Sequence, residues 1–149
     1  MMQVYDDEYF MRKALDEAEK AFNRGEIPVG VVVVIEDRII ARGHNLTETL
    51  NDVTAHAEMQ AITAASDFLG GKYLTNCKMY VTLEPCQMCA GALYWSQISN
   101  LIFAANDQQR GYRKTGVHLH PKTKVISGVL AEEASALLKR FFIEKRNLN

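Results

Sequence analysis

The first hydrophobic pattern along the chain recurs at intervals of three and four residues, between residues 8 and 24. Its apolar members are Phe10, Ala14, Leu15, Ala18, Ala21 and Phe22, with charged residues between them. This spacing is typical of an amphipathic helix packed on a core, and Gly25 follows it as a stop signal. We therefore expect a helix over 8–24 that contributes to the core and not to a binding site.

Shorter apolar runs predict the strands of a sheet. The run 29–35 is rich in β-branched residues, which indicates a buried strand, and Glu36-Asp37 forms a turn before a second strand over 38–42. Three further strands are expected over 79–83, 101–105 and 124–129. The polar segment 45–52 between the second strand and the next helix is expected to be a loop.

Three more helices are expected between and after these strands, over 56–66, 86–96 and 132–145. The basic connection 106–123 is long enough for a crossover, so the last strand is able to run parallel to its neighbour. This order of elements predicts an α/β fold in which helices cover a single sheet. At 149 residues the chain is expected to form one domain over 1–149.

Composition excludes several classes of protein. With 48% hydrophobic and 23% charged residues, the chain has enough apolar surface to fold, unlike a disordered segment. No apolar run approaches the roughly 20 residues of a membrane-spanning helix, and the acidic start, Asp6 to Glu8, lacks the pattern of a signal peptide. Three cysteines are too few for a disulfide framework, so we expect a reducing compartment and a cytoplasmic protein.

The net charge of −1 hides an asymmetry. Residues 1–105 hold 8 Lys or Arg against 14 Asp or Glu, whereas residues 106–149 hold 9 against 4. A basic C-terminal part is typical either of a solvated closing helix or of a surface that contacts a polyanion.

Candidate chemistry gathers at the predicted starts of two helices. His56 opens one helix, and Cys86 and Cys89 lie three residues apart at the start of the other. One imidazole and two thiolates suit zinc, and a set of three protein ligands leaves one position for water, as in catalytic sites. Helix N-termini also favour a thiolate over a thiol.

Glu58 lies two residues after His56. At this offset its carboxylate need not bind the metal, and it is able to exchange protons with a water there. Taken alone, a Cys-x-x-Cys pair is also compatible with redox activity or with half of a structural zinc site. The joint pattern of His-x-Glu followed by Pro-Cys-x-x-Cys matches the signature of zinc deaminases.

The chain resembles the bacterial tRNA-specific adenosine deaminases, a branch of the cytidine deaminase-like superfamily. The resemblance extends from about residue 8 to residue 146. It rests on the runs Glu26–Gly30, Gly43–Asn45, Thr54–Glu58, Val81–Ala92 and Gly128–Leu130, on Glu132-Glu133, and on Leu137-Leu138 before Phe141-Phe142.

The resemblance implies a three-layer α/β/α fold of the cytidine deaminase type, with a five-stranded mixed sheet and helices on both faces. It implies hydrolytic deamination of adenosine to inosine at the wobble position of a tRNA anticodon loop, by a homodimer with one Zn²⁺ per chain. His56, Cys86 and Cys89 then hold the zinc, and Glu58 is the catalytic proton carrier.

Substrate-binding residues also follow from the resemblance. Asn45 corresponds to the asparagine that holds the target nucleoside, although a loop-capping role is the alternative. Four apolar residues are expected to line the base pocket: Ile27, Val29, Ala57 and Leu83. Ordinary core packing is the alternative for Ile27, Val29 and Leu83.

One segment departs from the family. After Asp107 the family continues with small residues, whereas this chain has a basic stretch from Gln108 to Gly116. Within it, Arg110, Arg113 and Lys114 are candidates for phosphate contacts, and Tyr112 is a candidate for stacking on a base. The other RNA-contact candidates, on the closing helix, are Lys145 and Arg146. A solvated loop is the alternative for the basic stretch.

Two other functions remain open at this point. A small-molecule deaminase acting on guanine, cytosine or a related base or nucleoside would use the same zinc chemistry, and the departure after Asp107 favours it. A non-catalytic zinc-stabilised binding module is the second alternative, and the presence of Glu58 argues against it.

Overall fold

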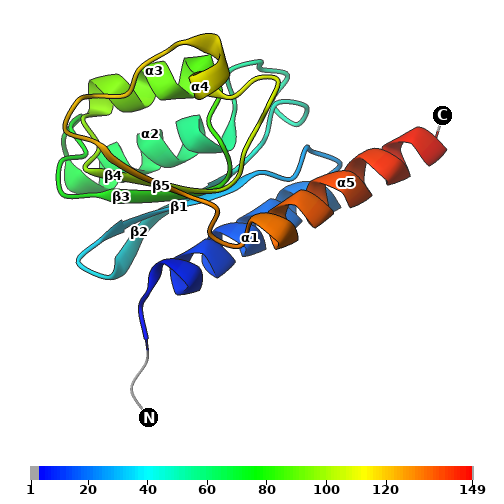
Figure 1. Cartoon of the computed structure of the whole chain (residues 1–149), viewed down its shortest axis with the longest axis horizontal. Coiled ribbons are helices and arrows are strands. Elements are labelled where there is room, and N and C mark those ends of the chain that lie inside the picture. The colour runs from blue at the N-terminus through cyan, green and yellow to red at the C-terminus, as the bar shows by residue number, and fades with distance from the viewer. Residues whose placement is uncertain (1–3, 149) are drawn as a thin grey trace.

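The computed structural model describes residues 4–148 and shows a five-stranded sheet in the order β2-β1-β3-β4-β5 (Figure 1). The strands are β1 (Gly30–Ile35), β2 (Arg38–His44), β3 (Lys78–Leu83), β4 (Asn100–Ala105) and β5 (Lys124–Ser127). The helices are α1 (Asp7–Asn23), α2 (Ala57–Leu69), α3 (Gln87–Ser96), α4 (Tyr112–Thr115) and α5 (Ala131–Asn147).

The sheet is mixed, as expected. β1 lies between β2 and β3 and is antiparallel to both, whereas β3, β4 and β5 run parallel. The chain returns from β4 to β5 through the connection that contains α4, which confirms the crossover and the parallel last strand.

Helices cover both faces of the sheet and make the three-layer α/β/α architecture (Figure 1). Along β1, Val31 and Val33 join the core under α2 and α3, and Val32 and Val34 join the core under α1 and α5. Because both faces are covered, the strand is apolar at successive positions instead of alternating. This explains the buried run that the sequence pattern identified.

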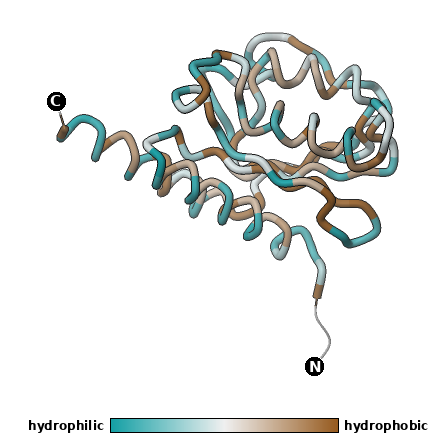
Figure 2. Tube along the Cα trace, turned by 180° about the vertical axis from the view of Figure 1, so that it is seen from behind, coloured by the Kyte–Doolittle hydropathy of each residue, from teal (hydrophilic) through white to brown (hydrophobic). Residues whose placement is uncertain are grey.

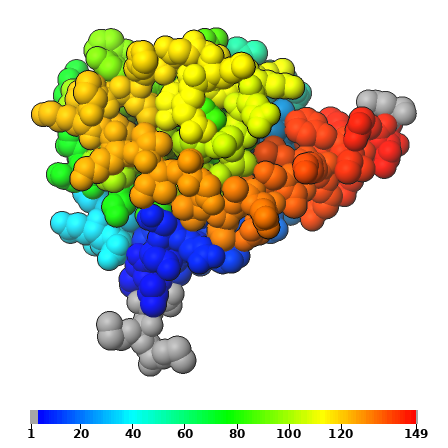
Figure 3. Space-filling model, viewed as in Figure 1, coloured from blue at the N-terminus to red at the C-terminus, as the bar shows by residue number. Residues whose placement is uncertain are grey.

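α1 and α5 pack beside each other on one face, where the rings of Phe22 and Phe141 meet edge to face at 5.8 Å. Hydrophobic and hydrophilic residues alternate along both helices in Figure 2, as expected for helices with one side on a core. The C-terminal part of α5 extends beyond the body of the molecule (Figures 1 and 3). None of the helices over residues 4–148 is both long and apolar enough to cross a membrane.

The candidate site lies on the opposite face of the sheet, where α2 packs directly against β2. A Cβ atom at Gly43 would come within 2.7 Å of the carbonyl oxygen of Ala57, so the first turn of α2 approaches the strand more closely than a side chain permits. This approach fixes the start of α2, where His56 and Glu58 lie.

The connection 106–123 is not a plain solvated loop, the alternative considered for its basic stretch. It contains the short helix α4, and Tyr112 is only 7% exposed, with its ring edge-on to Phe103 at 6.4 Å. The prediction that Tyr112 stacks on a base is therefore wrong, because its ring is covered by the core. The other elements match their predicted ranges to within a few residues at each end.

Candidate functional site

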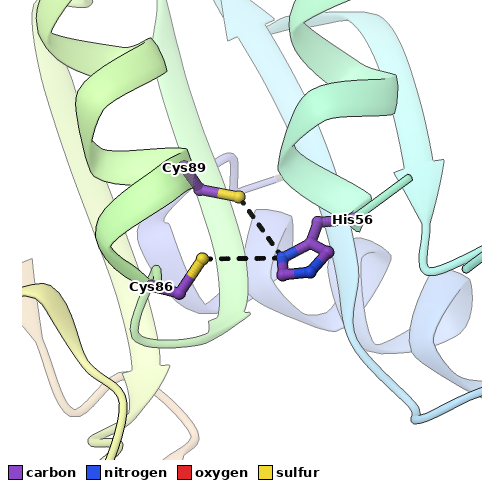
Figure 4. A group of neighbouring side chains, drawn as sticks. All are labelled: His56, Cys86 and Cys89. Atoms are coloured by element: carbon purple, nitrogen blue, oxygen red, sulfur yellow. Dashed lines mark hydrogen bonds between the residues drawn. The ribbon is translucent and has the colours of Figure 1, made fainter. Parts of the chain in front are cut away.

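Three metal-ligating side chains meet between the starts of α2 and α3 (Figure 4). His56 is the residue that caps α2, Cys86 caps α3, and Cys89 lies in the first turn of α3. The Nδ1 atom of His56 is 3.6 Å from the Sγ atom of Cys86 and 3.6 Å from that of Cys89. The geometry therefore brings together the three residues that the sequence predicted as zinc ligands.

The group fits a zinc ion. With bonds of about 2.3 Å to sulfur and 2.0–2.1 Å to nitrogen, two donors on a tetrahedral zinc lie about 3.6 Å apart. The two nitrogen-to-sulfur distances match this value. In the part of the chain that the structure describes, no fourth His, Cys, Asp or Glu joins the group, which is the donor count of catalytic zinc sites.

Electrostatics at the two helix starts also favour a cation. A hydrogen bond from the thiol of Cys89, together with His56, lowers the pKa of Cys86 to about 4, against the opposing effect of burial. The same hydrogen bond and burial raise the pKa of the Cys89 thiol. The lowered pKa of Cys86 favours its thiolate, and the hydrogen bond with Cys86, followed by the charge of Cys86, raises the pKa of His56.

Glu58 is the second residue of α2 and is 4% exposed. Burial raises the pKa of its carboxyl group to about 7, and the charge of Cys86 acts in the same direction. A group that titrates near neutral pH is able both to accept and to donate a proton there. Glu58 therefore has the properties that a general acid and base requires.

A pocket of about 170 Å³ lies beside the metal-ligating group, with Glu58 in its wall. It is also lined by every residue predicted to bind the substrate: Ile27, Val29, Asn45, Ala57 and Leu83. These residues come from four separate segments of the chain, which the fold brings to one place. Their roles toward a substrate stay predictions.

Asn45 shows the loop-capping contact considered from the sequence, and its role toward a nucleoside stays a prediction. Its side chain is 7% exposed, and its oxygen accepts a hydrogen bond from the backbone N–H of Thr47 at 3.3 Å. It therefore caps the turn that follows β2 while it lines the pocket.

Sequence reasoning missed two buried carboxylates that hold the pocket walls. Glu26 is 0% exposed and accepts hydrogen bonds from residues 47–49. Glu84 is 4% exposed and accepts from the backbone N–H groups of Asp107 and Arg113. The available signal was an acidic residue next to a run of buried apolar residues, a position where an unpaired charge is costly.

The basic residues after β4 do not share one environment. Arg110 lines the pocket, whereas the guanidinium of Arg113 pairs with Glu84 at 3.1 Å and donates to Asn106 at 2.8 Å. It also lies over the ring of Phe103, 4.9 Å from the centroid. Arg113, predicted as a phosphate contact, is exposed but has an internal partner. Lys114, Lys145 and Arg146 are exposed and join no ion pair among residues 4–148.

The chain is similar to known deaminases, including a family whose model describes a zinc-binding region. Residues 4–105 match the family model described as the cytidine and deoxycytidylate deaminase zinc-binding region. The chain is 44% identical over 146 residues to a tRNA-specific adenosine deaminase of Bacillus subtilis, which covers 94% of this chain and 91% of that protein.

Solved structures show a similar fold. One comes from a study of A-to-I editing by tRNA:A34 deaminases at the wobble position of transfer RNA. It has a TM-score of 0.79 and 40% identity, and the match covers 87% of this chain and 98% of that one. A guanine deaminase of Bacillus subtilis has a TM-score of 0.65 and 38% identity, over 74% of this chain and 68% of that one.

Proposed function

Since the chain belongs to the family of tRNA-specific adenosine deaminases, we propose that it converts adenosine to inosine at the wobble position of a tRNA anticodon by hydrolysis. The observation that carries the proposal is a buried carboxylate, Glu58, in the wall of the pocket beside His56, Cys86 and Cys89. A non-catalytic zinc module has no need of such a carboxylate.

The reaction replaces the amino group at C6 of adenine by oxygen from water and releases ammonia. Zinc held by His56, Cys86 and Cys89 supplies Lewis-acid chemistry that makes water a nucleophile at neutral pH. Glu58 accepts a proton from the attacking water and delivers it to N1 of the ring. It then takes the proton of the new hydroxyl group at C6 and delivers it to the amino group, which leaves as ammonia while the C6 carbonyl forms. Its pKa of about 7 suits both steps.

The pocket walls hold the base in place for this attack. Ile27, Val29 and Leu83 offer apolar surface to the faces of a purine ring, and Asn45 offers an amide to the nucleoside. A nucleotide in an anticodon loop is able to leave the base stack at lower cost than one in a duplex. The pocket therefore suits a base that has turned out of a loop.

The phosphates around that base would be held by basic side chains outside the pocket. We assign this role to Arg110 at the pocket wall, to Lys114 after it, and to Lys145 and Arg146 at the end of α5. Arg113 is left out, because its guanidinium pairs with Glu84. The segment that carries Arg110 and Lys114 lies on the face drawn in Figure 3.

We also assign the active form to a homodimer in the cytoplasm. Trp95 on α3 is 76% exposed and its neighbour Tyr94 is 37% exposed, a large aromatic surface on one of the two helices that carry zinc ligands. Such surface is typical of a protein interface. Three free cysteines and a tRNA substrate fit the cytoplasm.

A guanine deaminase is the second candidate function. Its supports are the 38% identity to the Bacillus subtilis guanine deaminase and the segment after Asp107, which forms part of the pocket and departs from the tRNA-acting branch. A pocket that accepts adenine is close in size to one that accepts guanine, so polar contacts decide between them.

Ammonia release from a panel of substrates tests both candidates. The panel holds an anticodon stem-loop with adenosine at the wobble position, the same stem-loop with guanosine there, and free adenosine, guanine and cytosine. We expect turnover of the first alone, and turnover of it by Glu58→Gln that is lower by about 10²–10⁴. Turnover of free guanine without turnover of RNA would replace the proposal by the second candidate, and no turnover of any substrate would favour the binding module.

A further inference from the structure

Glu26 precedes β1 by four residues and is 0% exposed. Its carboxylate accepts hydrogen bonds from the backbone N–H of Glu48 at 3.0 Å and of Thr49 at 2.6 Å. It also accepts from the Thr49 hydroxyl at 2.7 Å and from the Thr47 hydroxyl at 3.5 Å. All four donors belong to one short stretch of the loop between β2 and α2.

No ion pair among residues 4–148 includes Glu26. A buried carboxylate without a cation is costly unless hydrogen bonds replace its water. Burial alone would raise the pKa of Glu26, but the hydrogen bonds from residues 47–49 outweigh burial and lower it. The carboxylate therefore stays charged because the loop supplies the donors, and the loop is held because the carboxylate accepts them.

The loop held in this way forms one wall of the pocket. Thr47 lines the pocket and offers its hydroxyl to Glu26, while its backbone N–H binds the side-chain oxygen of Asn45. Glu26 is thus linked to Asn45 through two hydrogen bonds, both donated by Thr47.

The other side of Glu26 is joined to a second part of the pocket. Ile27 follows it directly and lines the pocket, as does Val29, whose carbonyl oxygen accepts from the backbone N–H of Asn45 at 3.1 Å. Glu26 therefore connects the segment before β1 to the loop after β2, and both segments contribute substrate-facing residues.

We infer that Glu26 is a positioning residue that sets the place of Asn45 and Thr47 in the pocket and so determines how tightly a nucleoside binds. The inference rests on the proposed function for the nature of the ligand. Glu26 does not line the pocket and exchanges no proton with the substrate, so its effect falls on substrate binding and leaves the proton transfers of Glu58 unchanged.

The test is Glu26→Gln in the zinc-loaded protein. Glutamine keeps the shape but replaces one acceptor oxygen by an NH₂ group, which faces the N–H donors of the loop and repels them. We expect KM to rise tenfold or more and kcat to stay within threefold of the wild-type value, with one zinc retained per chain. A merely structural loss would lower the active fraction, and hence the apparent kcat, without raising KM.

Two further variants calibrate this result. Glu48→Gln changes an exposed side chain in the same loop and keeps the backbone N–H that binds Glu26, so KM should not change. Thr49→Val removes one hydroxyl donor and leaves the carboxylate in place, so KM should rise by less than in Glu26→Gln. Thr49→Val also carries the test if Glu26→Gln fails to fold.

Amide hydrogen exchange keeps the inference separate from the proposed function. The N–H groups of Glu48 and Thr49 should exchange at least tenfold faster in Glu26→Gln than in the wild type, whatever the substrate. If RNA is not a substrate, KM is measured on the compound that the wild type turns over. Unchanged exchange and unchanged KM would overturn the inference, and so would a fall in kcat at constant KM.

Discussion

Two buried carboxylates beside one pocket have their pKa values shifted in opposite directions. Glu58, in the pocket wall at the start of α2, is 4% exposed and has its pKa raised to about 7, chiefly by burial. Glu26, behind the loop wall, is 0% exposed and has its pKa lowered. Burial raises the pKa of both carboxyl groups, so the lowered pKa of Glu26 needs a further cause.

The difference lies in the donors that each carboxylate receives. Glu26 accepts four hydrogen bonds from residues 47–49, which stabilise its charged form. Glu58 has the negatively charged Cys86 nearby, and its few hydrogen bonds do not offset burial. A carboxylate with many donors is suited to hold a loop, and one with few donors is suited to move a proton.

Glu84 is a third buried carboxylate, and its partners are a cation and backbone N–H groups. Burial would raise its pKa, but the Arg113 guanidinium and the backbone N–H groups of Asp107 and Arg113 lower it. Like Glu26, it holds a segment of the pocket wall, here the one with Asp107 and Arg110. Two walls of the pocket are thus each fixed by an ionised carboxylate.

The largest effect should follow from removing a zinc ligand beside Glu58. Cys86→Ala should abolish measurable deamination and lower the zinc content to a small fraction of one per chain, because two donors bind the ion weakly. Metal analysis and ammonia release measure both. Cys77→Ala is the matched control, since Cys77 is buried and lies outside the metal-ligating group. Full activity without zinc would contradict the proposed chemistry.

Glu58→Gln should change a different kinetic parameter from Glu26→Gln, namely kcat instead of KM. We expect kcat to fall by about 10²–10⁴, the usual contribution of a general acid and base, with KM and zinc content near their wild-type values. Steady-state kinetics with metal analysis checks this result. Loss of zinc would instead place Glu58 among the metal ligands, and the contrast with Glu26→Gln would then not hold.

Arg113→Ala tests whether Glu84 depends on its cation. The substitution leaves a buried carboxylate with backbone donors alone, and we expect the free energy of unfolding to fall by about 1–2 kcal/mol. This loss is smaller than for a fully buried ion pair, because the side chain of Arg113 is 48% exposed and water screens the pair. Urea unfolding measures it, with Lys114→Ala as the control that leaves stability unchanged. Equal stability of the two variants would remove the assigned role of Arg113.

The acid dependence of stability should reveal the charge of Glu26. Because folding lowers its pKa below the ordinary value of 4.5, its contribution to stability is complete above that pH and is lost as pH falls through the folded-state pKa. The difference in unfolding free energy between the wild type and Glu26→Gln should therefore be constant from pH 6 to 8, and shrink below about pH 4.5. A difference that does not vary with pH would show that Glu26 acts through packing alone.

The smallest effect should come from charges far from both carboxylates. Lys145→Ala with Arg146→Ala should raise KM for RNA a few-fold, leave kcat unchanged, and flatten the slope of log K against log salt by about 1–2. Phosphate contacts position a substrate and do no chemistry. Affinity measured from low to high salt checks the slope. An unchanged slope would remove these two residues from the RNA surface.

Much of the fold follows from local patterns. The spacing of apolar residues predicted α1, because periodicity reports which side of a helix is buried, and a run of β-branched residues predicted β1. The zinc ligands could be predicted for a similar reason. His56, Cys86 and Cys89 each stand at the start of a helix in a recognisable spacing, so a local motif contains most of the chemistry.

By itself, the sequence predicted an α/β architecture, three candidate metal ligands and a candidate proton carrier, because each prediction rests on patterns of residues a few positions apart. Only the tertiary structure decided what holds the pocket. Glu26 meets Thr49 across 23 positions and Glu84 meets Arg113 across 29. It also decided that Tyr112 is buried and that Arg113 turns to a carboxylate. For a charged or aromatic side chain in a polar stretch, the local sequence does not show whether the side chain faces solvent or a partner that the fold brings near. These contacts could therefore be identified only in the three-dimensional structure.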